Sequence, residues 1–372
     1  MKLLILLLVS VFPSIVFSQN NYLLIGTYTD AKSDGIYVYR FDTSTAENSF
    51  VSVAKTSNPS FLAISANNKF VYAVNENDDS TINPRGGTVT AFSFNKSNRT
   101  LTEINKQATG GKHPCYVTID KTGKWVFVGN YSSGTVSMFK TNKNGSISKY
   151  KQLITHEGSS TNLQRQKSPH VHAAVLSADN KYLFVPDLGI DKVMVYGFNK
   201  NEGVLKLSSS ASSTAGSGPR HFTFYPNKKY AYLMEELTGT VVFYIVNKGK
   251  LKMQQRINAM PKNFTGALGS ADIHISPDGK FLYCSNRGES NTISIFSIDA
   301  MIGKLSFIGH QSTLGKTPRN FNFDPSGNFL LVANQNSDEI VIFKIDKTTG
   351  LLTDTKKKIS VPNPVCIKWI NR

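Results

Sequence analysis

Charged residues flank one short turn near the middle of the chain. Arg220 and His221 begin an apolar run that ends at a Pro-Asn turn, and Glu235 and Glu236 end the run that follows it. A chain that reverses at such a turn brings the start of the first run beside the end of the second. The sequence therefore predicts that these four side chains share one edge of a sheet, where they could bind an anion or move a proton.

The same pattern of two apolar runs joined by a polar turn recurs along the chain. Six such turns lie at residues 65–69, 120–124, 177–181, 225–229, 276–280 and 324–328. A third apolar run and a weaker fourth run follow each pair, so the unit has four strands in about 50 residues and essentially no helix. Repeats of this kind are typical of the blades of a β-propeller rather than of a helical solenoid.

The two ends of the chain supply the parts of a seventh unit. Residues 22–27 and 35–41 read as a second and a third strand without a first, whereas residues 365–370 read as a first strand with nothing after it. Pairing the C-terminal strand with the N-terminal strands would close the ring without an open edge. We therefore predict an all-β, seven-bladed β-propeller with four-stranded blades, forming a single domain over residues 19–372.

The first residues have the pattern of an export signal. Lys2 precedes an apolar run at residues 3–17, and residues 16–18 have a small-residue cleavage pattern that favours cleavage before Gln19. The run contains Pro13 and is short for a membrane span. We predict a signal peptide at residues 1–18 and an exported mature protein, periplasmic or extracellular, that has no membrane span and acts as a monomer.

Composition narrows the classes of partner. The chain has 372 residues, and its 42 basic and 25 acidic residues give a formal charge of +17. The lysines are scattered through the turns, and the sequence has no recognition helix, zinc finger or RNA-binding motif, which argues against nucleic acid as a partner. Three cysteines, Cys115, Cys284 and Cys366, are too few and too widely spaced for a disulfide framework or a metal site. We expect neither a metal nor another cofactor.

Alignment of the repeats shows positions where the blades carry unlike residues. At the head of the first strand stand Ser60, Cys115, His172, Arg220, Ala271, Arg319 and Val365. The next position holds Phe61, Tyr116, Ala173, His221, Asp272, Asn320 and Cys366, and the position just after the second strand holds Tyr28, Glu76, Tyr131, Leu188, Glu236, Arg287 and Gln335. All three positions open onto the same face of a propeller, so they predict a polar small-molecule site at one mouth of the central channel.

Some polar residues near this mouth have simpler interpretations. Four asparagines end second strands, where an amide commonly satisfies a turn: Asn75, Asn130, Asn286 and Asn334. His170 and His172 alternate along a strand, and the alignment directs only His172 to the channel. Two long polar loops, residues 155–166 and 77–87, are candidate lids or ordinary loops. The charges of Arg220, Glu236 and Arg287 fit either a ligand site or one structural ion-pair cluster.

At these positions the chain resembles the seven-bladed propeller lactonases, which include the bacterial propeller-type 6-phosphogluconolactonases and the fungal carboxy-muconate lactonising enzymes. The matching stretches are residues 170–177, 185–189, 218–222, 236–237, 285–288 and 317–321. The resemblance implies a lactone hydrolase with site residues His172, Arg220, Glu236 and Arg287, the four that the alignment of repeats also selects. Their neighbours in the same positions are our candidates for binding substrate: His221, Asp272, Arg319, Asn320 and Gln335.

The chemistry implied is the opening of an anionic lactone. Glu236 or His172 would act as the general base, and Arg220 and Arg287 would bind a carboxylate or phosphate or stabilise the oxyanion. Because 6-phosphogluconolactone is a cytosolic metabolite, an exported enzyme is expected to act on a different anionic lactone or sugar acid. The same groups would serve a lactonising cycloisomerase, and a non-catalytic propeller could bind a sugar acid, a glycan or a protein at the same mouth.

Overall fold

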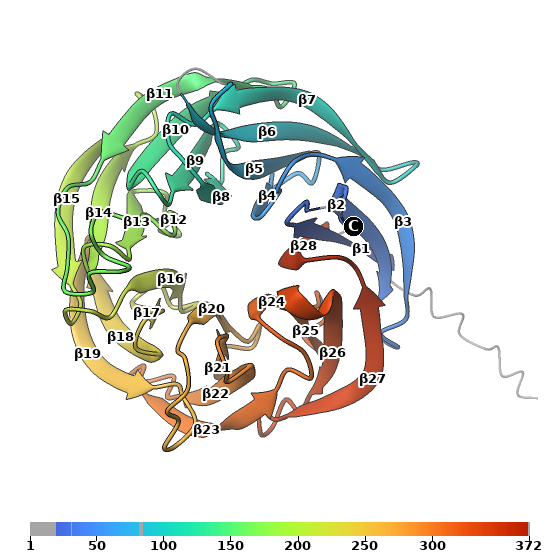
Figure 1. Cartoon of the computed structure of the whole chain (residues 1–372), viewed down its shortest axis with the longest axis vertical. Coiled ribbons are helices and arrows are strands. Elements are labelled where there is room, and N and C mark those ends of the chain that lie inside the picture. Colours follow the sequence, from blue (N-terminus) through green and yellow to red (C-terminus); the bar gives the residue numbers. More distant parts are fainter. Residues whose placement is uncertain (1–19, 31, 82–84, 371–372) are drawn as a thin grey trace, which may run out of the picture.

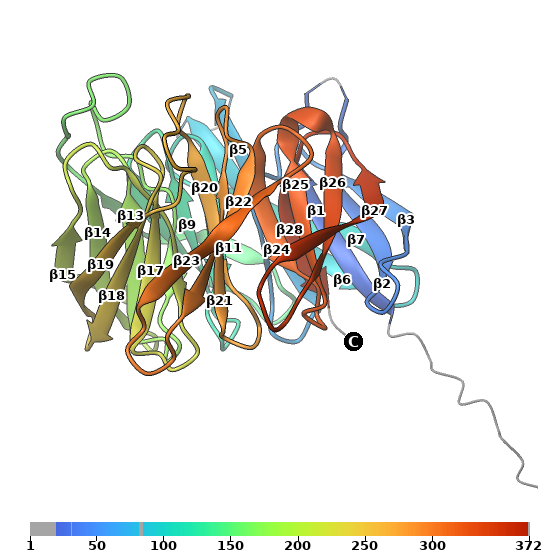
Figure 2. The ribbon, with the colours of Figure 1, turned by 90° about the horizontal axis from the view of Figure 1, so that it is seen from below.

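The chain forms a ring of seven four-stranded antiparallel sheets, as predicted (Figure 1). This computed structural model describes residues 20–30, 32–81 and 85–370, so the predicted signal peptide at residues 1–18 lies outside the described residues. Figure 2 shows the strands running between two faces of the ring, with the turns and loops on those faces. The polar residues at the starts of the first strands and at the ends of the second strands therefore collect on one face.

Each blade runs outward from the channel, from its first strand to its fourth (Figure 1). The first strands are β4 (Leu62–Ile64), β8 (Pro114–Ile119), β12 (Val175–Leu176), β16 (Pro219–Phe224), β20 (Ser270–Ile275), β24 (Pro318–Phe323) and β28 (Pro364–Ile370). The second strands are β1 (Asn20–Thr27), β5 (Phe70–Asp79), β9 (Trp125–Asn130), β13 (Tyr182–Asp187), β17 (Tyr230–Glu235), β21 (Phe281–Asn286) and β25 (Phe329–Asn334).

The outer half of each blade is a hairpin of the third and fourth strands. The third strands are β2 (Gly35–Asp42), β6 (Gly86–Asn95), β10 (Thr135–Thr141), β14 (Lys192–Asn199), β18 (Thr240–Asn247), β22 (Thr292–Ile298) and β26 (Glu339–Ile345). The fourth strands are β3 (Asn48–Lys55), β7 (Thr100–Ala108), β11 (Ile147–Thr155), β15 (Val204–Ser212), β19 (Lys250–Asn258), β23 (Leu305–Ser312) and β27 (Leu352–Ser360).

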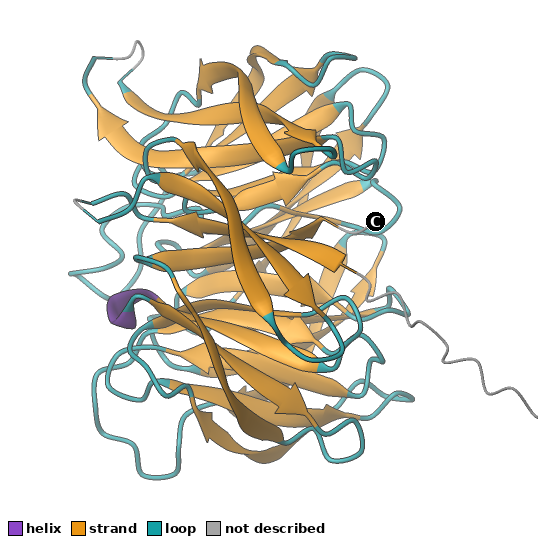
Figure 3. Cartoon of the chain, turned by 90° about the vertical axis from the view of Figure 1, so that its right-hand side faces the viewer, coloured by secondary structure: helices purple, strands orange, loops and turns teal. Residues whose placement is uncertain are grey.

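Helix is nearly absent from this fold. One helical turn, η1 (Gln335–Ser337), occurs among the described residues and follows β25 (Figure 3). In this part of the chain we find no helix with the length and apolar character needed to cross a membrane.

Burial explains the sequence pattern of the strands. The second strands β9 and β21 are buried along their whole length, because the neighbouring blades cover both of their faces. Such strands read as continuous apolar runs. The fourth strand β11 alternates between covered and exposed residues because it lies at the outer edge of its blade. This difference explains why the fourth run of each repeat is the weakest one in the sequence.

The ring closes through the pairing of the two ends of the chain. β28 is antiparallel to β1, with Ile25 opposite Ile367 and Gly26 opposite Cys366, which confirms the predicted closure. Ile367 is fully buried and packs in one apolar cluster with Ile25 and with Leu331 of the preceding blade. The last strand therefore fills the core between two blades as well as completing a sheet.

Five first strands carry an extra residue at the mouth, and in β28 it is Val365, since Cys366 pairs with Gly26 and Pro364 with Thr27. In β16, Pro219 pairs with Glu235 and His221 with Met234, so Arg220 is left without a partner across the ladder. The same register shift skips Cys115 in β8 and Arg319 in β24, and β20 shifts between Ser270 and Ile273. Such bulges bend a strand and redirect the side chain of the extra residue. They coincide with the positions at which the repeats carry unlike residues.

The blade of β12 to β15 departs from this pattern. Its first strand is only Val175–Leu176, and an irregular segment precedes it, held by an isolated pairing of Val171 with Asp187. The expectation that His170 and His172 alternate within a regular strand is therefore wrong. His172 is positioned instead by its backbone amide, which donates to the carbonyl oxygen of Pro186 at 3.0 Å.

Shortening the buried side chain at the ring closure should destabilise the protein. For Ile367→Ala we expect the free energy of unfolding to fall by about 2–5 kcal/mol, because a cavity opens between two blades. For the control Ile302→Ala, at an exposed turn, we expect a change of less than about 0.5 kcal/mol. Urea unfolding followed by tryptophan fluorescence measures both, and equal effects of the two substitutions would contradict the role given to β28.

Candidate active site

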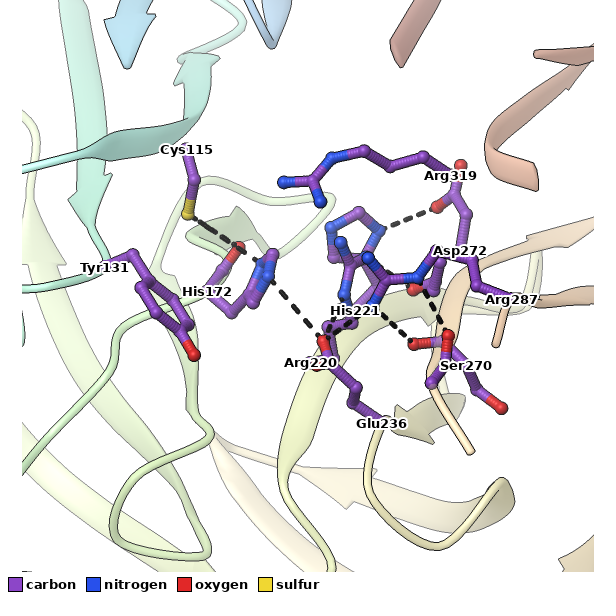
Figure 4. A network of polar contacts seen from close by, with 12 residues as sticks. Cys115, Tyr131, His172, Arg220, His221, Glu236, Ser270, Asp272, Arg287 and Arg319 are labelled. Carbon is purple, nitrogen blue, oxygen red and sulfur yellow. Dashed lines mark hydrogen bonds and ion pairs between the residues drawn. The ribbon is translucent and has the colours of Figure 1, made fainter. Parts of the chain in front are cut away.

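The carboxylate of Glu236 is surrounded by three guanidinium groups. Its Oε1 accepts a hydrogen bond from Nη2 of Arg165 at 2.7 Å, and its Oε2 accepts one from Nε of Arg220 at 2.8 Å. Nη2 of Arg287 lies 3.1 Å from the same Oε2. Figure 4 shows Arg220, Arg287 and His172 converging on this carboxylate. The predicted neighbourhood of Arg220 and Glu236 is therefore present, and Arg287 joins it from the adjacent blade.

The three positive charges keep Glu236 ionised. Burial acts to raise the pKa of this carboxyl, but Arg287, Arg220 and Arg165 outweigh burial and lower the pKa to about 2. Glu236 is thus a permanent anion at neutral pH. Three arginines against one glutamate leave an excess of positive charge at this point of the mouth.

Arg220 and Arg287 are held by the backbone as well as by Glu236. Nη1 of Arg220 donates to the carbonyl of Ala271 at 2.7 Å, and Nε of Arg287 donates to that of Gly269 at 2.8 Å. Burial lowers the pKa of both guanidinium groups, that of Arg287 to about 9, so both are still cations at neutral pH. Their planar forks are therefore fixed before any ligand arrives.

His172 lies beside this cluster without joining it. Its Nε2 is 4.0 Å from Oε2 of Glu236, beyond hydrogen-bond distance, and its ring stands edge-on to those of Tyr131 and His221. Burial, and then the nearby charge of Arg220, lower its pKa well below 6.5. His172 is therefore a neutral imidazole at neutral pH, positioned next to a fixed anion.

A second charged cluster occupies the opposite side of the mouth. The hydroxyl of Tyr28 donates to Oε2 of Glu76 at 2.9 Å, and Arg319 lies over the ring of Tyr28 and 3.9 Å from Oε1 of Glu76. Arg319 thus has an acidic and an aromatic partner within the protein. Its charge is balanced, unlike the charges around Glu236.

A third network lies deeper and ties the first strands together. Asp272 accepts hydrogen bonds from His221 at 2.7 Å and from His274 at 2.9 Å, and it also accepts one from the amide of Asn320. The other end of the Asn320 amide accepts from the backbone of Ile367 in β28 at 2.7 Å. Burial and the charge of Arg220 lower the pKa of His221 to about 4. Asn320 therefore has both polar atoms engaged within the protein and joins three blades.

A small cavity lies among the first strands beside these groups. The cavity there has about 10 Å³, room for about one water molecule. Its walls are Ser60, Phe61, Cys115, Arg220, His221, Arg319, Asn320 and Val365. This cavity by itself is too small for a lactone.

The loop after β11, which begins at residue 156, is anchored by hydrogen bonds on one side of the mouth. His156 is buried between Asp187, 2.7 Å away, and the hydroxyl of Tyr196, 2.8 Å away. The hydroxyl of Ser160 donates to Asp191, and the side chain of Gln166 donates to the carbonyl of Leu188 at 2.8 Å. Buried hydrogen bonds thus anchor this loop at several points. We call residues 156–169 the strap, because these bonds tie the loop to the blade of β12 to β15.

The predicted residues fall into groups. His172, Arg220, Glu236 and Arg287 converge on one point, whereas Arg319 belongs to the second cluster, and His221, Asp272 and Asn320 belong to the third. Gln335 begins η1, and its backbone amide donates to the carbonyl of Thr317. No contact between the Gln335 side chain and the three clusters is found among the described residues.

Sequence reasoning missed Arg165. It belongs to a loop that we named as a candidate lid, but loops have no place in an alignment of repeated strands. Tyr28, Glu76 and Tyr131 stood in the aligned position after the second strand and were not selected as site residues. The other candidate lid, residues 77–87, is largely an extension of the β5–β6 hairpin, and residues 82–84 lie outside the description.

The four asparagines have the structural role that we assigned to them. Asn75 donates to the hydroxyl of Thr56, Asn286 to the carbonyl of Ala259 and Asn334 to that of Thr313. Asn130 donates to Thr135 and Ser137. Each amide ties the end of a second strand to neighbouring backbone or hydroxyl groups, which holds the position just after it.

The described residues offer no ready metal site. Within residues 20–30, 32–81 and 85–370 we find no group of three or more His, Cys, Asp and Glu side chains able to hold an ion. The cysteines Cys115, Cys284 and Cys366 are buried and unpaired, and burial raises the pKa of each thiol.

Comparison with known proteins agrees with a propeller that carries a charged site at one mouth. Residues 22–369 match the family described as "Lactonase, 7-bladed beta-propeller". A 6-phosphogluconolactonase of Formosa agariphila is 41% identical over 91% of this chain and 96% of its own length. One of Bacillus subtilis is 36% identical over 94% of this chain and 98% of its own length.

Solved structures lead to the same family. The periplasmic gluconolactonase of Pseudomonas aeruginosa superposes with a TM-score of 0.90 at 36% identity, covering 94% of this chain and 99% of that one. The chain therefore belongs to the family of seven-bladed β-propeller lactonases. This confirms the resemblance seen in the sequence and the class of enzyme that it implied.

The stabilising effect of the Glu236 charge should disappear in acid. A pKa lowered from 4.5 to about 2 contributes about 3 kcal/mol of stability, which is fully present above pH 4.5 and is lost as the pH falls towards 2. Glu236→Gln lacks this contribution at every pH. We therefore expect the difference in unfolding free energy between wild type and variant to shrink from pH 5 to pH 2.

Urea unfolding at a series of pH values checks this expectation. Glu103→Gln, an exchange of an exposed glutamate on β7, is the matched control and should follow the wild type at each pH. A difference between wild type and Glu236→Gln that stays constant down to pH 2 would contradict the ion cluster. Because this substitution also costs stability, it is a poor probe of catalysis by itself.

Proposed function

We propose that this protein is a lactone hydrolase that opens an anionic lactone, a sugar-acid lactone or a related one, at the mouth of the channel. The observation that carries the proposal is the arrangement around Glu236: two fixed guanidinium forks, a third on the strap, and a neutral imidazole beside them. The names of the relatives, 6-phosphogluconolactonase and gluconolactonase, supply the reaction class.

The charge balance supports an anionic substrate. Arg165, Arg220 and Arg287 share the single carboxylate of Glu236, whereas Arg319 has Glu76 as its own partner. Buried charge without a counter-charge is costly, and a negatively charged ligand would relieve that cost. A carboxylate or phosphate matches the planar fork of a guanidinium group in two parallel hydrogen bonds.

The hydrolysis would proceed by attack of water on the lactone carbonyl. The water oxygen forms a bond to the carbonyl carbon while a proton passes from the water to His172. Arg220 and Arg287 stabilise the negative charge that develops on the carbonyl oxygen, and the ring C–O bond then breaks. The proton returns from His172 to the departing ring oxygen, which leaves a hydroxy acid.

We assign the role of general base to His172 rather than to Glu236. With a pKa of about 2 and three guanidinium groups around it, Glu236 has little tendency to take a proton. His172 is neutral at neutral pH, so one of its two ring nitrogens is unprotonated and can take a proton. Glu236 would hold the arginines in place and stabilise the imidazolium form of His172 from 4.0 Å away.

We further propose that the enzyme is exported and acts outside the cytosol. The signal-like pattern of residues 1–18 and the periplasmic relative of Pseudomonas aeruginosa support this. An exported enzyme would meet anionic lactones of sugar acids rather than intermediates of cytosolic metabolism. Lactonisation of a hydroxy acid would use the same groups in reverse, whereas binding of a sugar acid without turnover is the outcome that acid release distinguishes from hydrolysis.

Loss of the His172 imidazole should abolish most of the activity. For His172→Gln we expect kcat to fall about 10²- to 10⁴-fold on the best lactone substrate, as is usual for removal of a general base. The measurement is acid release in weak buffer, with spontaneous hydrolysis subtracted, from 6-phosphogluconolactone, gluconolactone and muconolactone-type substrates. His310→Gln, on the outer strand β23, is the control and should keep wild-type kcat.

This assay distinguishes a lactone hydrolase from a non-catalytic propeller that only binds sugar acids. A His172→Gln variant that keeps half of the wild-type kcat would remove His172 from the mechanism. A folded wild-type protein that binds the sugar acids but opens none of these lactones would favour the non-catalytic propeller.

The pH profile of the activity should lack the usual histidine inflection. Since burial and Arg220 lower the pKa of His172 well below 6.5, the base stays unprotonated as the pH falls through 6.5. We expect kcat/KM, corrected for the spontaneous reaction, to be level between pH 7.5 and pH 5.5. A tenfold loss of kcat/KM centred near pH 6.5 would contradict the assignment of a depressed pKa.

A further inference from the structure

Arg165 differs from Arg220 and Arg287, the other two arginines that contact Glu236, in the hydrogen-bond partners of its guanidinium group. Arg220 and Arg287 donate to backbone carbonyls, but the guanidinium group of Arg165 is held by side chains alone, the Glu236 carboxylate at 2.7 Å and the Tyr131 hydroxyl at 3.2 Å. Its side chain is 42% exposed, against 1% for Arg220 and 15% for Arg287. Arg165 is thus the guanidinium of this cluster that faces the solvent above the mouth.

The backbone that carries Arg165 is nevertheless fixed. Its amide donates to Asn162, the next amide donates to the carbonyl of the same residue at 2.7 Å, and the buried side chain of Gln166 donates to the carbonyl of Leu188. The point of attachment of the side chain is therefore fixed before a ligand arrives. Such an arrangement lowers the entropy lost when the guanidinium group binds a ligand.

The described residues engage a single nitrogen of Arg165. Both of its contacts use Nη2, and among residues 20–30, 32–81 and 85–370 we find no hydrogen bond to Nε or Nη1. An anion arriving at the mouth could bind these nitrogens, or it could take the place of Glu236 on Nη2. Glu236 would keep Arg220 and Arg287 as partners in either case, so the exchange would leave no buried charge unpaired.

We propose that Arg165 is the residue that selects substrates by their negative charge, binding the carboxylate or phosphate substituent of the lactone while Arg220 and Arg287 face the ester carbonyl. This inference rests on the proposed function and adds to it a division of labour. The fixed arginines serve the reaction common to all lactones, and the strap decides which lactones are held.

The test compares charged with neutral lactones in three variants. Arg165→Gln removes the guanidinium group, and Arg165→Lys keeps the charge but loses the planar fork. Lys167→Gln removes the same charge from an exposed position two residues along the strap and is the control. The substrates are 6-phosphogluconolactone with a phosphate, glucarolactone with a carboxylate, and the neutral gluconolactone.

We expect Arg165→Gln to lower the ratio of kcat/KM for a charged lactone to that for gluconolactone by about 10- to 100-fold, the range for loss of a hydrogen bond to a charged group. The loss should appear mainly as a higher KM. Arg165→Lys should recover part of it, and Lys167→Gln should leave the ratio at its wild-type value. A fall with only one of the two charged lactones would identify that anion as the one recognised.

Three results would overturn the inference. One is an unchanged ratio in Arg165→Gln, and another is an equal fall in Lys167→Gln, which would reveal a general effect of net charge. A fall in kcat that is the same for all three lactones would likewise remove Arg165 from substrate selection, because it would indicate a role in the common reaction.

A binding measurement separates this inference from the proposed function. If the wild type opens none of the lactones, lactone hydrolysis fails, and calorimetric titration with 6-phosphogluconate and with gluconate then decides the role of Arg165. Weaker binding of 6-phosphogluconate by Arg165→Gln, but not by Lys167→Gln, would keep the charge-selecting role in a binding protein. If both variants and the wild type bind 6-phosphogluconate with equal affinity, or if none of them binds it, the charge-selecting role of Arg165 is contradicted.

Discussion

The buried carboxylate of Glu236 is the group on which the mouth of the propeller depends. It follows β17, and its three guanidinium partners come from the strap, from β16 and from the residue after β21. One anion thus joins its own blade, the next blade and the loop of the preceding one. Because a buried charge cannot lose its partners without a large cost, these segments are fixed relative to one another.

The scaffold prepares this cluster in two ways. Bulges at the heads of the first strands leave Arg220 and Arg319 outside the ladder and direct them to the mouth. Asparagines at the ends of the second strands bind neighbouring backbone and hydroxyl groups, which steadies the next position along the chain. The charged side chains therefore stand on backbone whose own hydrogen bonds are already satisfied, as preorganised sites require.

The three clusters divide the mouth by charge. The Asp272 network is saturated with hydrogen bonds and reaches β28, so it supports the ring closure as much as the mouth. Arg319 is balanced by Glu76, and the Glu236 cluster alone keeps an excess of positive charge. Members of one family can share such a scaffold and differ in substrate through the loops that cover it, which is why family membership fixes the reaction class more firmly than the lactone.

The sequence by itself determined the ring, because turn residues and apolar runs are local signals repeated six times, and the unmatched strands at the two ends require closure. It also brought out Arg220, Glu236, Arg287 and His172, since equivalent positions in equivalent blades must meet at the channel. Only the tertiary structure placed Arg165 on Glu236, 71 residues away, because the path of a long loop follows no repeat.

Only the tertiary structure, too, showed that the amide of Asn320 is engaged at both ends and that His172 precedes its strand. Periodicity tells which positions converge. It does not tell which polar groups satisfy one another once they have converged, because that depends on distances between blades that the local sequence does not encode.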